Sequence, residues 1–337
     1  MYISEAAGAM CGSYAISQAV NDTLTASMEL CAGVPFGAAS MGDDYGYSRM
    51  LTVYRDFNLS IDDIAYLFGI ELKRMDFEDN SEFTKFLMSY LLNSIYDKKD
   101  KKIKNNNNAR LVCGPLNMSF LKYLPLSQQY RGADHYIALF KIDDSLFISD
   151  SEGAALIKVT ADELSRMFSI KDIPEACGKI TVREILSYSK DKILSNEIIA
   201  HTIRRAAENF RAAENSGQGS GAFREIINIV KYVNPVKWSA ALYIDIGNYI
   251  QRKIMISEFF ENIKFGCLSA YYNLQLNQFN QFNSLTAHLK KSVLDAAHIR
   301  RMLRDRKYNT IPELLLKLSE SEKITASLII NMEDRNL

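Results

Sequence analysis

GADHYIALFKIDDSLFISD, residues 132–150, is the stretch of sequence that decides the fold. It holds two apolar runs, HYIALFKI and SLFISD, which the adjacent aspartates Asp143 and Asp144 separate. Two such runs with a short polar connection predict an antiparallel β-hairpin. The start of the first strand then lies beside the end of the second, which brings His135 next to Asp150. A carboxylate in that place holds an imidazole in one tautomer and stabilises its protonated form.

Further strands are expected on both sides of this hairpin. ARLVCGPL, residues 109–116, precedes it, AALIKVT, residues 154–160, follows it, and another strand is expected near residues 70–75. Thr160 and Glu163 form a capping box for a short helix over ELSRMF. The sequence therefore predicts a sheet with helices between some of its strands.

Two longer helices are predicted in the first half of the chain. LSIDDIAYLFGIEL is typical of a helix that begins at an N-cap, Ser60, and ends at a glycine. SEFTKFLMSYLLNSIY, residues 81–96, has the apolar spacing of an amphipathic helix, with Asn80 or Ser81 as its cap. Between the first of these helices and the start of the chain, residues 33–50 hold four glycines and indicate a loop that shapes a surface.

AAGAMCGSYAISQAV, residues 6–20, places a thiol close to the start of the chain. We expect a helix to begin at Cys11. A free cysteine in such a place is often a small apolar core residue. The alternative is a nucleophile at the helix N-terminus, where the helix dipole favours a thiolate.

The chain changes character near residue 190, because helical periodicity dominates from there on. SGQGSG, residues 216–221, separates two of these helices, and it is no dinucleotide motif because no strand precedes it. We expect two domains, residues 1–190 and residues 191–337. Further helices are predicted at residues 238–265, 266–280, 284–305 and 311–325.

Composition excludes several classes of protein. The 337 residues include 40 basic and 40 acidic side chains, and this balance argues against nucleic acid as the main partner. We find no apolar run of membrane-spanning length and no signal-peptide pattern, so we expect a cytoplasmic protein. The five cysteines are an odd number without a CxxC pair, which fits neither a disulfide framework nor a zinc site.

A thiol nucleophile needs a base, and the base needs an orienting partner. Of the four histidines, His201, His288 and His298 lie in the helical half, whereas His135 begins an apolar strand. A single histidine at a strand edge is more often structural than catalytic. Its expected pairing with Asp150, together with a cysteine before a helix, favours a Cys-His-Asp site.

VCGPLNMSFLKYLP, residues 112–125, and the hairpin followed by SEG carry a resemblance to a known family. They resemble papain-like (C39-like) cysteine enzymes of the butirosin-biosynthesis branch, and overall character and length are similar to the amide synthetases of polythioamide assembly. The resemblance implies an α+β fold. A papain-like domain with an antiparallel sheet and an N-terminal catalytic helix is followed by a mostly helical domain that covers the cleft.

The resemblance also implies an activity. Members of this branch move an acyl group from a carrier-protein thioester to an amine in antibiotic biosynthesis, with no bound cofactor or metal. Cys11 is then the nucleophile, His135 the base and Asp150 the orienting residue. The partners are a phosphopantetheinyl acyl or peptidyl carrier protein and a small-molecule amine.

Two positions depart from the family pattern. Papain-like enzymes place a glutamine six residues before the cysteine, where this chain has Glu5, and an ionised carboxylate cannot donate to an oxyanion. Asn117 stands where an aspartate is expected in this branch. The oxyanion donors then remain open between the backbone N–H of Cys11 and the side chain of Asn117, which is equally well explained as a turn residue.

Other assignments stay open at this stage. Asp43, Asp44 and Tyr45 could hold a cationic amine or form a solvated turn. The basic run at residues 98–104 fits a solvated loop, or else a landing patch for an acidic carrier protein. The alternative functions are a cysteine peptidase and an inactive protein that binds ligands in the same cleft. The amphipathic C-terminal helices could also pack against another copy of the chain.

Overall fold

The structure is a computed structural model, and it describes residues 4–20, 28, 36–38, 51–53, 61–96, 110–121, 134–142, 145–150, 154–168, 179–189, 196–265 and 276–333. The chain divides into two compact units. The sheet unit comprises Met1–Thr25 and Ser60–Lys190, and the helical unit comprises Ala26–Leu59 and Asp191–Leu337. Residues 26–59, which the sequence analysis placed in the first domain, thus group with the helices.

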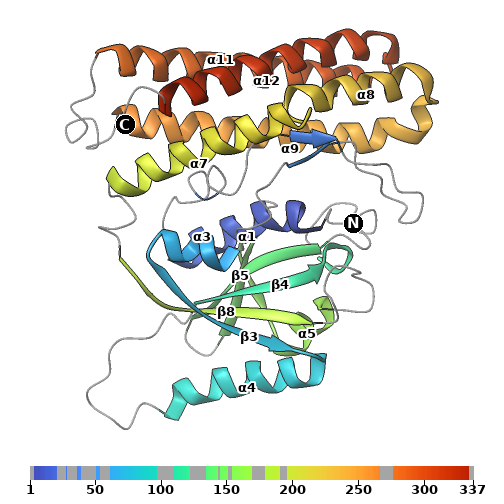
Figure 1. Cartoon of the computed structure of the whole chain (residues 1–337). Helices are drawn as coiled ribbons and strands as arrows, with labels where there is room; N and C mark the ends of the chain where they lie inside the picture. Colours follow the sequence, from blue (N-terminus) through green and yellow to red (C-terminus); the bar gives the residue numbers. More distant parts are fainter. Residues whose placement is uncertain are drawn as a thin grey trace. The chain divides into compact units, whose positions relative to one another are not determined.

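A six-stranded antiparallel sheet forms the centre of the sheet unit (Figure 1). The strand order is β3-β8-β4-β5-β6-β7, so β8, from the end of the unit, lies between two earlier strands. The bounds are β3 Ile70–Phe77, β4 Arg110–Asn117, β5 Asp134–Ile142, β6 Ser145–Asp150, β7 Ala154–Val159 and β8 Ile180–Tyr188. The predicted hairpin is confirmed, because β5 and β6 pair from Ile142 with Ser145 onward.

Helices pack against both faces of this sheet (Figure 1). They are α1 Ser4–Val20 and α3 Ile61–Leu67 on one face, and α4 Asn80–Tyr96 and α5 Ala161–Met167 on the other. The α4–α5 side has a continuous apolar core in which Phe83, Phe168 and Ile137 are buried. Gly12 of α1 lies so close to α3 that an added Cβ would meet Ile61 Cδ1 at 2.3 Å.

One predicted helix start and one predicted cap are wrong, and another predicted cap is confirmed. Helix α1 begins at Ser4 rather than at Cys11, because the alanines before the cysteine are strong helix formers. The cap of α4 is Asp79, whose Oδ1 accepts the backbone N–H of Glu82 at 2.8 Å. The capping box of α5 is present as predicted, and Ser60 lies outside the described residues.

The helical unit consists of long helices and one short strand pair. Its elements are β1 Phe36–Ala38, β2 Leu51–Val53, α7 Asn196–Asn215, α8 Ser220–Tyr232, α9 Pro235–Phe265, α11 Leu276–Arg304 and α12 Ile311–Glu333. The predicted break between α7 and α8 is confirmed, and Gly217 and Gly219 adopt positive φ there. A predicted break at residues 281–283 is wrong, because burial of Phe282 and Leu285 keeps α11 continuous.

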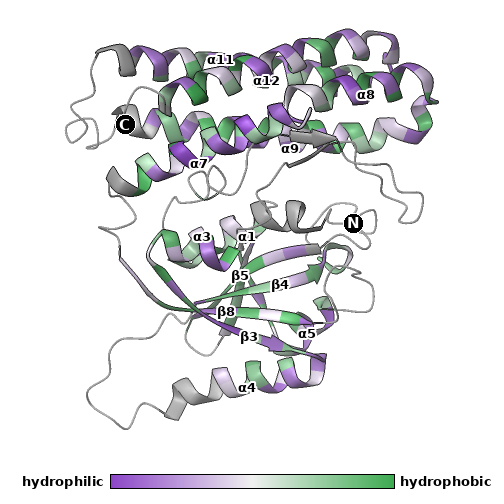
Figure 2. Ribbon diagram, viewed as in Figure 1, coloured by the Kyte–Doolittle hydropathy of each residue, from purple (hydrophilic) through white to green (hydrophobic). Residues whose placement is uncertain are grey.

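Hydrophobic and hydrophilic residues are interspersed along the helices of this unit (Figure 2), and many of the apolar ones are buried. Trp238, Tyr249 and Phe260 are among the largest fully buried side chains. Short 3-10 turns lie at Met118–Phe120 and Tyr308–Thr310. Among the described residues, no helix combines the length and apolar character that crossing a bilayer requires.

Candidate functional site

The predicted pairing of His135 with Asp150 is present in the structure. The β5–β6 ladder ends at Ala138 and Ser149, and just past it His135 Nε2 lies 2.6 Å from Asp150 Oδ1. Both side chains are buried, at 3% and 1% exposure. The pair is thus shielded from water, and the other ring nitrogen of His135, Nδ1, is left for a second partner.

That second partner is Cys11. Burial lowers the pKa of His135, but the charge of Cys11, the hydrogen bonds from Asp150 and Cys11 and the charge of Asp150 outweigh it. They raise the pKa of His135 well above its usual value of 6.5. Cys11, His135 and Asp150 therefore interact electrostatically as one group, with the imidazole of His135 in the middle.

Cys11 is presented by the interior of α1. The helix packs across β5 and β4, and the thiol is 5% exposed. Because α1 begins seven residues earlier, the helix dipole, which acts within the first turn, does not explain a reactive thiol. The backbone N–H of Cys11 is no oxyanion donor either, since inside a helix it is directed at the carbonyl four residues before it.

A different backbone donor reaches the sulfur. The N–H of Tyr136, next to the histidine, donates to Cys11 Sγ at 3.3 Å. Tyr136 has an unusual place in the pairing of β5 with β4. Cys113 of β4 pairs with Ile137 of β5, and the next pair is Leu116 with His135. One extra residue in β4 therefore lies opposite Tyr136, which is the pattern of a β-bulge.

The bulge contains Gly114, which is joined to Pro115 by a cis peptide bond. The Tyr136 ring lies against this glycine, since an added Cβ would meet ring atoms at 2.3 to 2.6 Å. The Arg183 guanidinium carbon lies 5.8 Å from the centroid of the same ring. Arg183 itself is held by Asp62 of α3, through Nε at 2.6 Å and Nη2 at 3.0 Å.

Asn117 lies at the end of β4, where the register pairs it with Asp134, the neighbour of His135. Its side chain is fully buried, and its Oδ1 accepts from the backbone N–H and the hydroxyl of Ser119 at 3.0 and 2.7 Å. The amide nitrogen Nδ2 has no hydrogen-bond partner among the described residues. A buried donor without a partner is costly, so this one is a candidate for binding a substrate oxygen.

The other predicted binding residues cannot be placed relative to this site, since they fall in parts of the chain that the structure does not describe. The Glu5 side chain, Asp43, Asp44 and Tyr45 lie outside the described residues, as does the basic run. The backbone of Glu5 belongs to α1, the helix that also carries Cys11.

Cys113 is a second cysteine of the sheet unit, and its environment differs from that of Cys11. It is fully buried in β4 within the apolar core, and burial raises the pKa of its thiol, although Arg183 opposes this. Neither Cys11 nor Cys113 forms a disulfide bond. Only Cys11 of these two lies against an imidazole.

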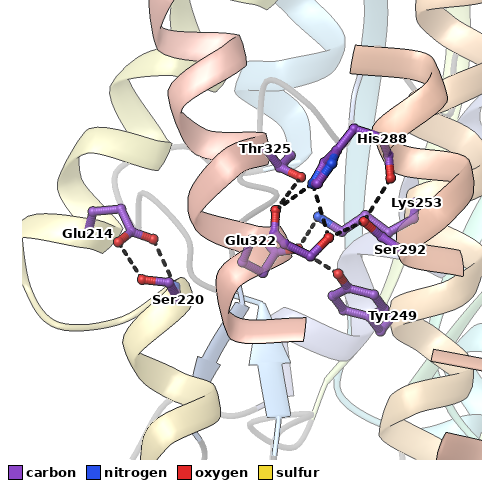
Figure 3. A network of polar contacts seen from close by, with 9 residues as sticks. Glu214, Ser220, Tyr249, Lys253, His288, Ser292, Glu322 and Thr325 are labelled. Carbon is purple, nitrogen blue, oxygen red and sulfur yellow. Dashed lines mark hydrogen bonds and ion pairs between the residues drawn. The ribbon is translucent and has the colours of Figure 1, made fainter. Parts of the chain in front are cut away.

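A second polar cluster lies in the helical unit (Figure 3). Lys253 of α9 forms a buried ion pair with Glu322 of α12, and Tyr249 donates to the same carboxylate at 2.9 Å. Beside them, His288 Nε2 lies 2.9 Å from the carbonyl of Ser321, to which it donates. Because Nε2 of His288 donates to this carbonyl, it does not act as a base for the nearby hydroxyls. The cluster instead links α9, α11 and α12.

Comparison with known proteins adds no family to this description. Neither the known protein families nor the curated proteins include a match to this chain. Within the described residues, no group of histidine, cysteine and carboxylate side chains has the arrangement of a metal site. The site must therefore be interpreted from its own geometry.

Proposed function

We propose that the chain is a cysteine-dependent acyltransferase that forms amide bonds, with Cys11 as nucleophile, His135 as base and Asp150 as orienting residue. The acyl donor is a thioester on a phosphopantetheinyl carrier protein, and the acceptor is a small-molecule amine. One observation carries the proposal: an imidazole that is hydrogen-bonded to a buried carboxylate at 2.6 Å also interacts with the thiol of Cys11. The α+β fold with its antiparallel sheet supports a papain-like domain, and the resemblance of residues 112–125 and of the hairpin supports the substrate class.

The first half of the reaction loads the enzyme. The proton of Cys11 moves to His135, and the thiolate attacks the thioester carbonyl to form a tetrahedral oxyanion. Collapse of the oxyanion breaks the bond to the carrier sulfur, which leaves as a thiolate and takes a proton from His135. The products are an acylated Cys11 and a free carrier thiol.

The second half transfers the acyl group. The amine attacks the acylated sulfur's carbonyl while His135 removes its proton, and the C–S bond breaks to release the amide and restore Cys11. Asp150 stabilises the imidazolium that forms in both halves. Thioesters suit this site, because a thiolate leaves without the firm protonation that a peptide nitrogen needs.

The oxyanion needs donors, and Asn117 is the best candidate. A neutral amide can donate where the carboxylate of Glu5 cannot. The buried and unpartnered Nδ2 of Asn117 lies at the end of β4 that pairs with the start of β5. We propose that it binds the substrate oxygen.

The proposal is tested with purified protein, an acylated carrier protein and a diamine. An amide product that depends on both the amine and Cys11 is expected. The Cys11→Ala variant is the control, and it must remain folded. Cleavage of peptides without any carrier protein would instead identify a cysteine peptidase, and the absence of both activities would indicate a binding protein.

A further inference from the structure

The sulfur of Cys11 has a polar contact that the proposed triad does not use, the backbone N–H of Tyr136. We propose that Arg183, clamped by Asp62, is a positioning residue that holds Tyr136 so that its backbone N–H stays directed at the sulfur of Cys11. This inference rests on the proposed function, because it assigns a support to the same nucleophile. It deepens that function by naming a hydrogen-bond donor that would stabilise the thiolate formed when the proton of Cys11 moves to His135.

The need for such a support follows from the strand pairing. Ile137 and His135 are paired with residues of β4, but Tyr136 between them faces the bulge at Gly114 and Pro115. The ladder therefore does not fix Tyr136 as it fixes its neighbours. A proline in the bulge also has no N–H to offer a carbonyl of β5.

Side-chain contacts hold Tyr136 in place where the strand pairing does not. The Tyr136 ring packs against Gly114, and the Arg183 guanidinium carbon lies 5.8 Å from the centroid of this ring. Arg183 belongs to β8, and its two hydrogen bonds to Asp62 form the planar fork that fixes a guanidinium in one orientation. Arg183 is 5% exposed, so water competes little with these contacts.

The contact has a direct chemical consequence. A hydrogen-bond donor directed at sulfur favours its anionic form over the thiol. The other titratable groups that act on this sulfur are His135 from β5 and, through it, Asp150 from β6. Arg183 from β8 and Asp62 from α3 act through the position of Tyr136.

The experiment measures the alkylation rate of Cys11 by iodoacetamide across a range of pH, with peptide mapping to separate the cysteines. In Arg183→Met and Gly114→Ala, alkylation at neutral pH is expected to be about fivefold slower, the effect of one ordinary hydrogen bond, and its pH profile moves to higher pH. Arg74→Met is the matched control, since Arg74 is exposed and reaches the same carboxylate at 3.8 Å. It is expected to stay within about twofold of the unaltered protein.

The two variants act independently. Gly114→Ala displaces the ring through a direct clash with the added Cβ and uncovers no charge, so it decides the question if Arg183→Met does not fold. Arg183→Lys keeps the charge but loses the fork, and it is expected to behave like Arg183→Met. Folding of each variant is checked by circular dichroism.

The inference is overturned if Cys11 reacts at the unaltered rate in the folded variants, or if Arg183→Lys restores that rate completely. Failure of the proposed function gives a different result. In that case Cys11 of the unaltered protein reacts no faster than Cys113, which is buried in the core of the same unit.

Discussion

The buried imidazole of His135 lies between Asp150 and Cys11. Burial opposes its protonation, but Cys11 and Asp150 together raise its pKa above the usual 6.5. Because the folded-state pKa is raised, the pair stabilises the folded protein fully below the unfolded value of about 6.5. This stabilisation is lost as the pH rises through the higher folded-state pKa.

Asp150→Asn tests this electrostatic account. The substitution keeps the size of the side chain but removes its charge and weakens its hydrogen bond. We expect the pKa of His135 to fall, as followed by NMR titration of the labelled imidazole. The difference in unfolding free energy between the two proteins should be largest at acidic to neutral pH and should shrink at alkaline pH. An unchanged imidazole titration would contradict the pairing.

His135→Ala separates the roles of the two catalytic partners. Without a base near Cys11, we expect acyl loading from a carrier thioester to slow by about a hundredfold or more, since general-base catalysis contributes factors of this order. Rapid-quench mass spectrometry measures the loading rate. Loading at the unaltered rate in a folded His135→Ala protein would show that another base is used.

Single residues differ in how far the sequence could identify them. His135 and Asp150 could be paired because a hairpin relates them locally, only 15 positions apart. Arg183 gave no such signal, because β8 reaches its place between β3 and β4 through long-range pairing. Tyr136 contributes its backbone, which no side-chain pattern reveals.

Among the elements, β4 departs from regular pairing where the site needs it. Its bulge at Gly114 places Tyr136 opposite an extra residue and ends near Asn117. The strand itself was predictable from ARLVCGPL, but the shift of register was not. Likewise, α1 was predictable, yet it begins at Ser4 rather than at Cys11, because the alanines before the cysteine are strong helix formers.

The cap of α5 offers a test at this scale. Thr160 Oγ1 accepts the N–H of Glu163 at 3.1 Å, and Glu163 accepts the N–H of Thr160 at 2.9 Å. Thr160→Ala should reduce the unfolding free energy by about 1 kcal/mol. Urea unfolding provides the measurement, and Asp162→Ala, an exposed change in the same turn, is the control. Equal stability of the two variants would count against the cap.

At the scale of the whole molecule, the helical unit contains a buried ion pair of its own. Lys253 and Glu322 are completely buried between α9 and α12 (Figure 3), and Tyr249 shares the carboxylate. Burial raises the pKa of Tyr249, and the nearby Glu322 raises it further. The hydroxyl therefore remains a donor to the carboxylate at physiological pH.

Removing one partner of this ion pair should be costly. Lys253→Met leaves the charge of Glu322 buried without its cation, so we expect a loss of about 3 to 5 kcal/mol in unfolding free energy. The double variant Lys253→Met with Glu322→Gln should recover much of this loss, since neither charge is then buried. A double variant less stable than Lys253→Met would contradict this account, because it would show that the loss does not come from the unpaired buried charge of Glu322.

The two units also differ in what could be foreseen. The α+β character and the helices from residue 196 onward follow from periodicity in the sequence. The grouping of residues 26–59 with the helical unit does not, because it depends on contacts of β1 with α8 and of β2 with α9. Short strands without an apolar alternation give no signal of their own.

The central claim is that Cys11 carries the acyl group. Incubation of the protein with an acylated carrier protein, without amine, followed by intact mass measurement and peptide mapping, tests it most directly. We predict a mass increase equal to the acyl group on the peptide that contains Cys11, and its loss on addition of the amine. An unmodified Cys11, or the same acylation in the Cys11→Ala protein, would contradict the account.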